Sequence, residues 1–280
     1  MIRKCGIILQ TLNIYGAVAI VSLGWALSCL LHFQCAAYLP LWFFAALFIY
    51  NLDRLRHEPA DLINLPDRSR HSMGLRRISR TLAILSATTL MAIPVMQHDW
   101  LMSILTVTGA FICVNYSVPL LGFRFKDIPL LKTFFVPTLV TAAFLIPPLL
   151  QQPLRDDPLH HLFLSAWAWC VAFFNMILCD LRDIEGDSRT GIRTLPVTLG
   201  RRRTFQILLA LLACSIALSI GVLFKSKPST IVQWACIAAI MPIYLGCLLA
   251  AARKPRPESF YEWWVDGILF VPALVYLILR

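Results

Sequence analysis

The chain has 280 residues, of which 59% are hydrophobic and 14% are charged, and its formal net charge is +10. This hydrophobic content lies well above, and this charged content well below, the averages of soluble globular domains. The composition therefore excludes an ordinary soluble enzyme and indicates an integral, multi-pass membrane protein.

Nine segments of the sequence are candidate membrane spans. Each is apolar for about 17 to 24 residues, and a helix needs roughly 20 such residues to cross the hydrocarbon core. The pattern predicts an all-α polytopic bundle of about nine transmembrane helices around a central cavity, folded as a single domain over residues 1–280. The expected spans lie near residues 10–31, 36–52, 81–97, 99–118, 130–151, 160–179, 204–224, 229–252 and 263–279.

Basic residues are distributed unequally between the two sides of this predicted bundle. With a cytoplasmic N-terminus, the inner connections hold 21 Lys and Arg residues and the outer side holds 4. The positive-inside rule predicts such an excess on the cytoplasmic side. The positive net charge is then explained by basic residues that orient the protein in the membrane and contact anionic lipid. We therefore expect no nucleic-acid partner, and we expect a protein of a bacterial inner membrane whose N-terminus and long loops face the cytoplasm. The opening segment reads as a retained anchor and not as a cleavable signal peptide.

Two inner connections, residues 51–79 and 180–203, are long and polar. Loops of this length in a compact protein are usually functional or disordered. Both follow an apolar span, both contain Asp and Arg near their start, and they are four spans apart. This offset suggests a four-helix repeat, with spans 1–4 and 5–8 as its two copies.

The second of these loops carries a cluster of acids. If the sixth span continued as a helix, Asp180, Asp183 and Asp187 would lie within roughly 60° of one another on one face. Like charges at this spacing repel one another. A solvated helix end would retain this repulsion, whereas a bound divalent cation would remove it. Carboxylate oxygens suit Mg²⁺, which commonly links them to a substrate phosphate. We favour a metal site at these three residues over a solvated helix end.

The first loop offers weaker candidates. Asp53 and His57 lie at i and i+4 on one helical face, and Asp61 follows Pro59, which ends or kinks a helix. Asp53 is the stronger metal-ligand candidate, while His57 and Asp61 are open between a ligand and a structural role. Asn51 would point about 160° away from Asp53 on a helix, so it is not expected to share an ion with it.

A third inner element, residues 115–132, brings cations to the same membrane face. It contains Arg124, Lys126 and Lys132, with the phenol of Tyr116 near its start. A site balanced in charge would result if the carboxylates held a metal and the metal held a diphosphate. The basic side chains would then neutralise the remaining diphosphate oxygens. Positive-inside anchoring explains Lys126 equally well.

On these residues the chain resembles the UbiA superfamily of intramembrane prenyltransferases. DLRDIEGDSRTGIRTLPVTLG, at residues 180–200, is similar to the family's second Asp-rich motif and the loop that follows it. YSVPLLGFRFKDIPLLK, at residues 116–132, is similar to the segment between its fourth and fifth spans. The resemblance implies nine transmembrane helices over nearly the whole chain.

The resemblance also implies roles for individual residues. Asp180, Asp183 and Asp187 would bind Mg²⁺ and diphosphate, with Asp183 and Asp187 as catalytic residues. Asp53, also catalytic, and Asp61 would ligate metal from the first loop. Candidate substrate contacts are Arg124, Lys126, Lys132, Arg182, Tyr116 and His57. The family's first motif, Asn-Asp followed by Asp three and seven residues later, is altered here, because Asn51 is followed by Leu52 and then Asp53.

For this family, Mg²⁺ and cationic side chains would assist ionisation of an allylic diphosphate, and the carbocation would alkylate an aromatic or other lipophilic acceptor. Ring faces could stabilise that cation, although most of the candidate aromatic residues are expected to be packing contacts: Phe134, Phe135, Phe173, Phe174 and Trp169. Two alternatives stay open. The altered first motif allows a catalytically weakened protein that binds lipid or diphosphate or assists assembly, and the possible repeat allows a transporter of an anionic substrate.

Overall fold

The computed structural model describes residues 2–56, 58–153 and 157–280, with side chains from residue 6 onward. Within these residues every regular element is a helix, which confirms the predicted all-α class. The chain divides into two compact units, each of which is assembled from separated segments. Unit 1 consists of Met1–Val21, Ala36–Lys132 and Asp183–Arg193, and unit 2 consists of Ser22–Cys35, Thr133–Arg182 and Thr194–Arg280. The expected four-helix repeat and the expected central cavity stay predictions.

Seven helices of the described residues are long and apolar enough to cross a membrane, so the count of nine is not confirmed. The difference lies in the first two expected spans. Asn13, with a φ of 59°, separates α1 (Ile2–Thr11) from α2 (Ile14–Leu30) and leaves α2 with 17 residues. The next helix, α3 (Tyr38–Leu55), is not among the seven, and its last turns contain Asn51, Asp53 and Arg54.

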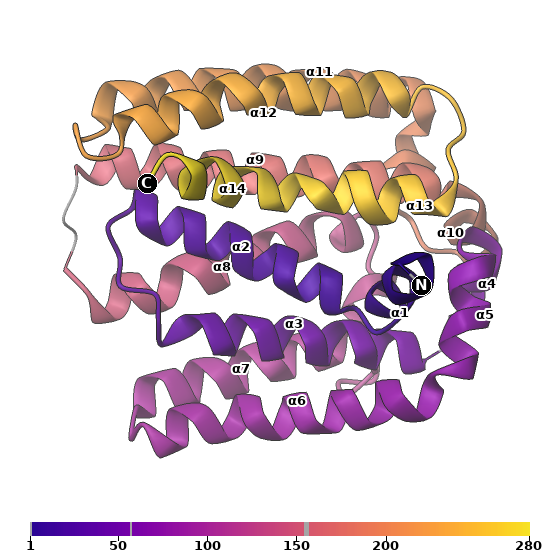
Figure 1. Cartoon of the computed structure of the whole chain (residues 1–280). Helices are drawn as coiled ribbons and strands as arrows, with labels where there is room; N and C mark the ends of the chain where they lie inside the picture. Colours follow the sequence, from indigo (N-terminus) through magenta and orange to yellow (C-terminus); the bar gives the residue numbers. More distant parts are fainter. Residues whose placement is uncertain (1, 57, 154–156) are drawn as a thin grey trace. The chain divides into compact units, whose positions relative to one another are not determined.

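Unit 1 is built around α3, which packs against α6 (Arg76–Met96) and α7 (Trp100–Ser117), as Figure 1 shows. Most of the buried side chains on α6 are small and recur every three or four residues, so they form one stripe along the helix. Small residues on such a stripe allow helix backbones to approach closely, which is how helices associate where lipid supplies no hydrophobic drive. The stripe consists of Ser79, Ala83, Ser86, Leu90 and Pro94.

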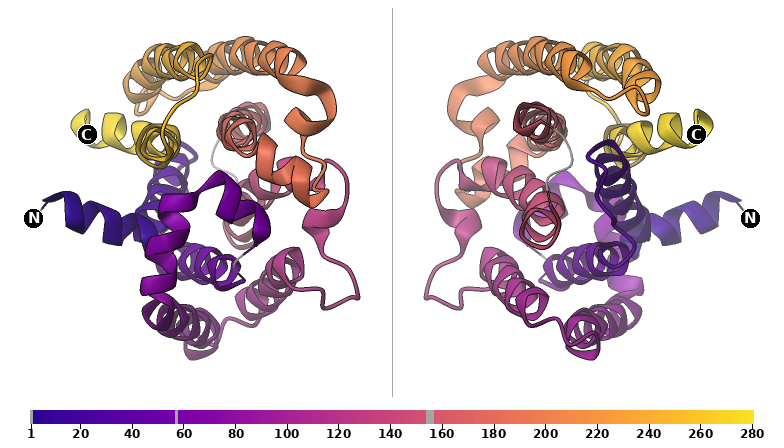
Figure 2. Two further views of the ribbon diagram at one scale, coloured as in Figure 1. Left: turned by 90° about the vertical axis from the view of Figure 1, so that its right-hand side faces the viewer. Right: turned by 90° about the vertical axis from the view of Figure 1, so that its left-hand side faces the viewer.

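Short helices at one end of unit 1 position its polar residues. Figures 1 and 2 show α4 (Pro59–Asn64) and α5 (Pro66–Gly74) running across the direction of α3 and α6. Proline at the first position begins each of them, where the missing N–H costs no intrahelical hydrogen bond. The unit also contains the 3₁₀ turn η1 (Phe125–Asp127), which packs on α7, and α10 (Ile184–Thr190), which packs on α4.

Unit 2 is centred on α9 (Pro158–Arg182), of which half of the apolar window is buried, against 22–33% in the other six candidate spans. A helix that is apolar on all sides belongs inside a bundle, whereas the others keep a lipid-facing side. The principal partner of α9 is α11 (Leu195–Lys225), which pairs in turn with α12 (Ile231–Ala251). The unit also includes α8 (Leu131–Gln151) from residue 133 and a final run of α13 (Glu258–Phe260), η2 (Tyr261–Val265), η3 (Asp266–Phe270) and α14 (Val271–Ile278).

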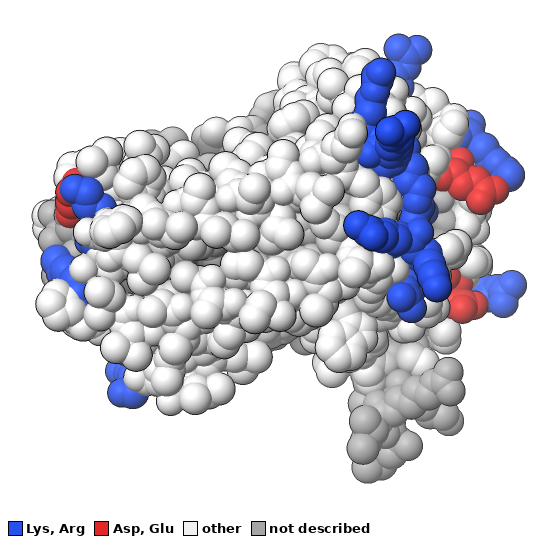
Figure 3. All heavy atoms as spheres, turned by 90° about the horizontal axis from the view of Figure 1, so that it is seen from above, with Lys and Arg blue, Asp and Glu red and all other residues white. Residues whose placement is uncertain are grey.

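The face formed by α11 and α12 has charge at its ends only. Figure 3 shows Lys and Arg side chains gathered at one end of this face and an uncharged middle. Residues 204–224 of α11 contain no Lys, Arg, Asp or Glu, and 21 residues span about 31 Å at 1.5 Å per residue. This length matches the hydrocarbon core of a bilayer, about 30 Å. The exposed cations at the crowded end are Arg201, Arg202, Arg203, Arg253, Lys254 and Arg256.

Trp234 joins three helices of unit 2. Its ring meets the edge of Trp167 on α9 at 4.9 Å between centroids, and its Nε1–H donates to the carbonyl oxygen of Ser219 on α11 at 3.0 Å. Both indoles are fully buried. Because a buried indole needs a hydrogen-bond partner and makes a large contact area, this position is a point of high packing energy.

We predict that Trp234→Phe lowers the free energy of unfolding by about 1–3 kcal/mol, because it removes the buried hydrogen bond and part of the ring contact. Thermal unfolding in detergent measures the change. Trp100→Phe is the matched control, since Trp100 is 73% exposed, and it should shift stability by no more than about 0.5 kcal/mol. Equal shifts for the two variants would contradict this account.

Candidate functional site

The helix expected through residues 180–187 is interrupted. In the structure α9 ends at Arg182 and α10 begins at Ile184, with Asp183 between them at φ −88° and ψ 4°. The cause is the side chain of Asn64, whose Oδ1 accepts the Gly186 N–H at 2.7 Å. In a continuous helix that N–H would donate to the carbonyl of residue 182. The face shared by three aspartates, which assumed a continuous helix, is therefore not formed in that way.

Asn64 and Gly186 dock α10 onto α4. Besides accepting from Gly186, Asn64 donates from Nδ2 to the Asp183 carbonyl oxygen at 3.0 Å. A Cβ on Gly186 would lie 2.5 Å from the Ala60 carbonyl oxygen and 2.5 Å from Asn64 Nδ2. Only glycine permits this close approach of the two backbones. The contact joins segments that are more than a hundred residues apart in the sequence.

This docking groups three carboxylates within unit 1, from Asp61 on α4 and from Asp183 and Asp187 at α10. Asp183 and Asp187 are buried. Burial raises the pKa of Asp187, and the charges of Asp183 and Asp61 raise it further against the opposing effect of Lys132. Burial likewise raises the pKa of Asp61, with Asp53 and Asp183 adding to the effect and Arg54 opposing it. The charges of these carboxylates thus oppose one another, and a bound positive charge would relieve this repulsion.

Lys132 brings one such charge. Its Nζ lies 2.7 Å from Asp187 Oδ2, and both side chains are largely buried. The segment before it is held to the end of α10, because the Leu130 N–H donates to the Arg193 carbonyl oxygen at 2.8 Å. Gly191, at a φ of 80°, ends α10 in the left-handed conformation that glycine adopts without strain.

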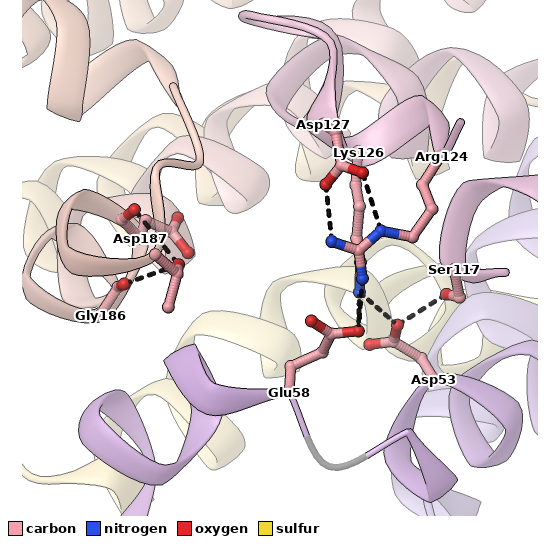
Figure 4. Close-up of polar contacts among 9 residues, drawn as sticks. Asp53, Glu58, Ser117, Arg124, Lys126, Asp127, Gly186 and Asp187 are labelled. Atoms are coloured by element: carbon pink, nitrogen blue, oxygen red, sulfur yellow. Dashed lines mark hydrogen bonds and ion pairs between the residues drawn. The ribbon is translucent and has the colours of Figure 1, made fainter. Parts of the chain in front are cut away.

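A second polar cluster of unit 1 is centred on Lys126, whose side chain is 5% exposed. Figure 4 shows its ammonium group between the carboxylates of Asp53 and Glu58, at 3.3 Å and 3.0 Å. The Ser117 hydroxyl donates to the same Asp53 oxygen at 2.6 Å. Burial opposes ionisation of Asp53, but Lys126, Ser117 and the charge of Arg54 outweigh it and lower the pKa of this carboxyl.

Arg124 extends this cluster. Its guanidinium donates to both carboxylate oxygens of Asp127, at 2.8 Å and 2.7 Å, and to Glu58 Oε1 at 2.8 Å. The bonds to Asp127, followed by the charge of Glu58, raise the pKa of Arg124 above its usual range despite partial burial. Glu58 was not predicted from the sequence, although an acid five residues after Asp53 and directly before Pro59 was a usable signal.

Three other predicted residues have different surroundings, and a fourth lies outside the described residues. Asp180, 0% exposed, lies in unit 2, where its Oδ2 accepts the Thr133 hydroxyl at 2.6 Å. The guanidinium of Arg182 lies over the Tyr261 ring at 5.2 Å, also in unit 2. Tyr116 is half-buried in α7, and His57 lies outside the described residues. The roles expected for these four residues stay predictions.

Asn51 and the candidate aromatic residues have packing partners. The Asn51 side chain is buried and donates to the carbonyl oxygens of Leu12 and Leu47, at 3.0 Å and 2.8 Å. In unit 2 the rings of Phe134, Trp169 and Phe173 lie against one another, with centroids 4.7–6.4 Å apart. Their expected role beside a carbocation stays a prediction, as does any such role of Phe135 and Phe174.

The acids at α4 and α10 have the chemistry of an Mg²⁺ site. Among the residues that the structure describes, no three His, Cys, Asp or Glu side chains are gathered closely enough to hold a metal by themselves. Mg²⁺ does not require this, because it keeps several waters and is usually held by one or two carboxylates together with substrate phosphates. Asp61, Asp183 and Asp187 supply oxygen ligands of this kind and mutual repulsion that a cation would relieve, so they fit.

We predict that Gly186→Ala destabilises the protein by about 1–3 kcal/mol, because the new Cβ forces α10 away from the α4 backbone. Gly109→Ala on α7 is the control, since a Cβ there meets nothing within 4 Å and alanine is the better helix former by up to about 1 kcal/mol. Thermal unfolding of both variants tests the contact. Unchanged stability of Gly186→Ala would show that the two helices are not packed this closely.

Comparison with known proteins yields relatives over most of the chain. A digeranylgeranylglyceryl phosphate synthase of Natronomonas pharaonis is 24% identical over 225 residues, which cover 79% of this chain and 75% of the relative. A lycopene elongase/hydratase of Haloferax volcanii is 30% identical over 132 residues, 42% of this chain and 39% of the relative.

Solved structures with a similar fold include a UbiA homolog from Archaeoglobus fulgidus bound to GPP and Mg²⁺. It is 14% identical, has a TM-score of 0.66 and covers 95% of this chain and 97% of its own. At this identity the likeness shows the fold alone. The model of the UbiA prenyltransferase family matches residues 61–265, a segment that includes Asp61, Lys132 and the whole of α10. With seven apolar helices and this match over most of its length, the chain belongs to the UbiA prenyltransferase family and is a multi-pass integral membrane protein.

Proposed function

We propose that the protein transfers a prenyl group from a prenyl diphosphate to a lipophilic acceptor within the membrane, with Mg²⁺ as cofactor. The observation that carries this proposal is the grouping of Asp61, Asp183 and Asp187 by the α4–α10 contact, with the ammonium of Lys132 on Asp187. Relatives bind compatible ligands, since structures of the Archaeoglobus homolog hold DMAPP or GPP with Mg²⁺.

In this proposal each group of unit 1 has a separate task. Asp183 and Asp187, with Asp61, would hold Mg²⁺, and the bound ion would supply positive charge to the diphosphate leaving group. Lys132 donates a hydrogen bond to a diphosphate oxygen as negative charge develops there, and Asp187 orients the ammonium group for this purpose. Arg124 is a further diphosphate contact. The rigid docking of α10 on α4 keeps these groups in place before substrate arrives, which lowers the cost of reorganisation during the reaction.

The proposed reaction is ionisation followed by alkylation. The allylic carbon–oxygen bond breaks, and its electron pair leaves with the diphosphate. An electron-rich atom of the acceptor then bonds to the allylic carbocation, and the acceptor loses a proton. An apolar surrounding dissolves the isoprenoid and excludes water that would capture the cation.

We propose a lipophilic acceptor, and the names of the relatives indicate the range of such substrates. One relative is named for the synthesis of digeranylgeranylglyceryl phosphate and another for the elongation and hydration of lycopene. An assay panel should therefore include an isoprenyl glyceryl phosphate, a polyene and an aromatic acceptor. Binding of prenyl diphosphate without product from any of them would favour the alternative of a lipid- or diphosphate-binding protein.

We also propose that the end of unit 2 that bears Arg201–Arg203 and Arg253–Arg256 faces the cytoplasm. The opposite end of the α11–α12 pair carries only Lys225 and Lys227, and the side of a membrane richer in Lys and Arg is normally cytoplasmic. A bacterial inner membrane stays the predicted location.

We predict that Asp187→Asn lowers Mg²⁺-dependent transfer from geranyl diphosphate by at least about 100-fold, since one preorganised charge in such a site typically contributes that much. Chelation of Mg²⁺ should abolish turnover of the unsubstituted protein. Glu185→Gln is the matched control, because Glu185 is on the same helix but is 66% exposed and pairs with the exposed Arg189, and it should retain turnover. Full activity of Asp187→Asn would refute the proposal.

Substitution of Lys132 should change the pH dependence. The ammonium lowers the pKa of Asp187, so in Lys132→Gln this carboxyl holds its proton to higher pH, and a smaller fraction is ionised at any given acidic pH. We therefore expect the acidic limb of the rate profile to move to higher pH, together with a loss of about 10–100-fold in kcat/KM. Lys225→Gln, which removes an ion pair with Asp157, should change neither quantity. A profile that stays in place would exclude the coupling between Lys132 and Asp187.

A further inference from the structure

The cluster around Lys126 already contains a cation. An ammonium group that is 5% exposed is stable only when it is paired and hydrogen-bonded. Here the partners are Asp53 Oδ1 and Glu58 Oε1. The first lies at the end of α3 and the second directly before α4, so one side chain from the η1 turn links both ends of the connection between these helices.

Both carboxylates have a further partner besides Lys126. Asp53 also accepts the Ser117 hydroxyl at 2.6 Å, and Glu58 also accepts from Arg124 at 2.8 Å. The pKa values of the acids differ accordingly. The pKa of Asp53 is lowered, whereas the pKa values of Asp61 and Asp187 are raised. Asp53 and Glu58 are thus held by cationic side chains before any metal is bound.

A divalent cation and the Lys126 ammonium would compete for the same oxygens. Mg²⁺ binds carboxylate oxygens at about 2.0–2.1 Å and demands near-octahedral geometry. The position between Asp53 Oδ1 and Glu58 Oε1 is filled by Nζ at 3.3 Å and 3.0 Å, as the close-up in Figure 4 shows. Asp53 and Glu58 thus do not fit a metal while Lys126 is in place.

We propose that the Lys126 ammonium is a built-in cation that replaces a divalent metal between Asp53 and Glu58, so that metal binding is confined to Asp61, Asp183 and Asp187. Only the second half of this statement rests on the proposed function. In this proposal Glu58 positions the Lys126 ammonium group, and Asp53 does not ligate Mg²⁺ as the sequence had led us to expect.

The test is the number of Mn²⁺ ions bound by the full chain in detergent, measured by electron paramagnetic resonance of free Mn²⁺ without substrate. Lys126→Met should bind one more Mn²⁺ than the unsubstituted protein, because two carboxylates are released from their cation. Asp53→Asn should leave the number and the affinity unchanged, whereas Asp187→Asn should lose an ion.

The double variant Asp53→Asn with Lys126→Met removes an acid and a base together, and it should return the number to that of the unsubstituted protein. Thermal unfolding establishes that each variant is folded. If Lys126→Met does not fold, the number of Mn²⁺ ions bound by the double variant and by Asp53→Asn tests the proposal instead.

Two results would overturn the inference: a folded Lys126→Met that binds no additional ion, or a loss of Mn²⁺ or an affinity at least tenfold weaker in Asp53→Asn. Failure of the proposed function has a different signature. It would appear as no bound Mn²⁺ and no turnover in the unsubstituted protein, while the difference caused by Lys126→Met would still be measurable.

Discussion

The polar part of unit 1 depends on the docking of α10 against α4 through one amide side chain. Asn64 uses its oxygen and its nitrogen on the backbone of residues 183–186, and Gly186 allows the two backbones to meet. An amide that satisfies both a donor and an acceptor stabilises one register only, since a shift by one residue would leave buried polar groups unpaired. The grouping of three carboxylates follows from this register and needs no attraction among the acids themselves.

The two polar clusters of unit 1, around Lys126 and around Asp61 with α10, differ in how their acids are paired. Around Lys126 and Arg124 each acid has a cationic partner, and a network whose members are all paired is rigid. Around Asp61 and α10, burial and neighbouring acids raise the pKa values of Asp61 and Asp187, although Lys132 pairs with Asp187. Buried acids whose pKa values are raised are candidates for a functional site. On this ground we place the proposed metal site at Asp61 and α10 and not at Asp53 and Glu58.

Much of this could be predicted from the sequence, and what could not has a specific cause. Composition and apolar segments were sufficient for the all-helical membrane class, since those signals are local. Acids at the edge of an apolar segment, a placement that is costly without compensation, made Asp180, Asp183 and Asp187 candidate metal ligands, and this role stays a prediction. The helix break at Asp183 was not predictable, because it is caused by Asn64, 119 residues earlier. Glu58 was missed for a similar reason: its partners Arg124 and Lys126 lie more than sixty residues away and become neighbours only in the fold.

The order in which the ribosome makes these segments gives the Asn64 contact a consequence for biogenesis. Asn64 is synthesised 119 residues before Asp183, an interval of roughly 6–24 s at 5–20 residues per second. Throughout that time α4 carries an amide and an acid without their final partners, while the intervening hydrophobic helices are already entering the bilayer. The contact between α4 and α10 can form only after α9 has been made, so a nascent chain that stalls before residue 183 would carry most of the apolar helices and lack this contact.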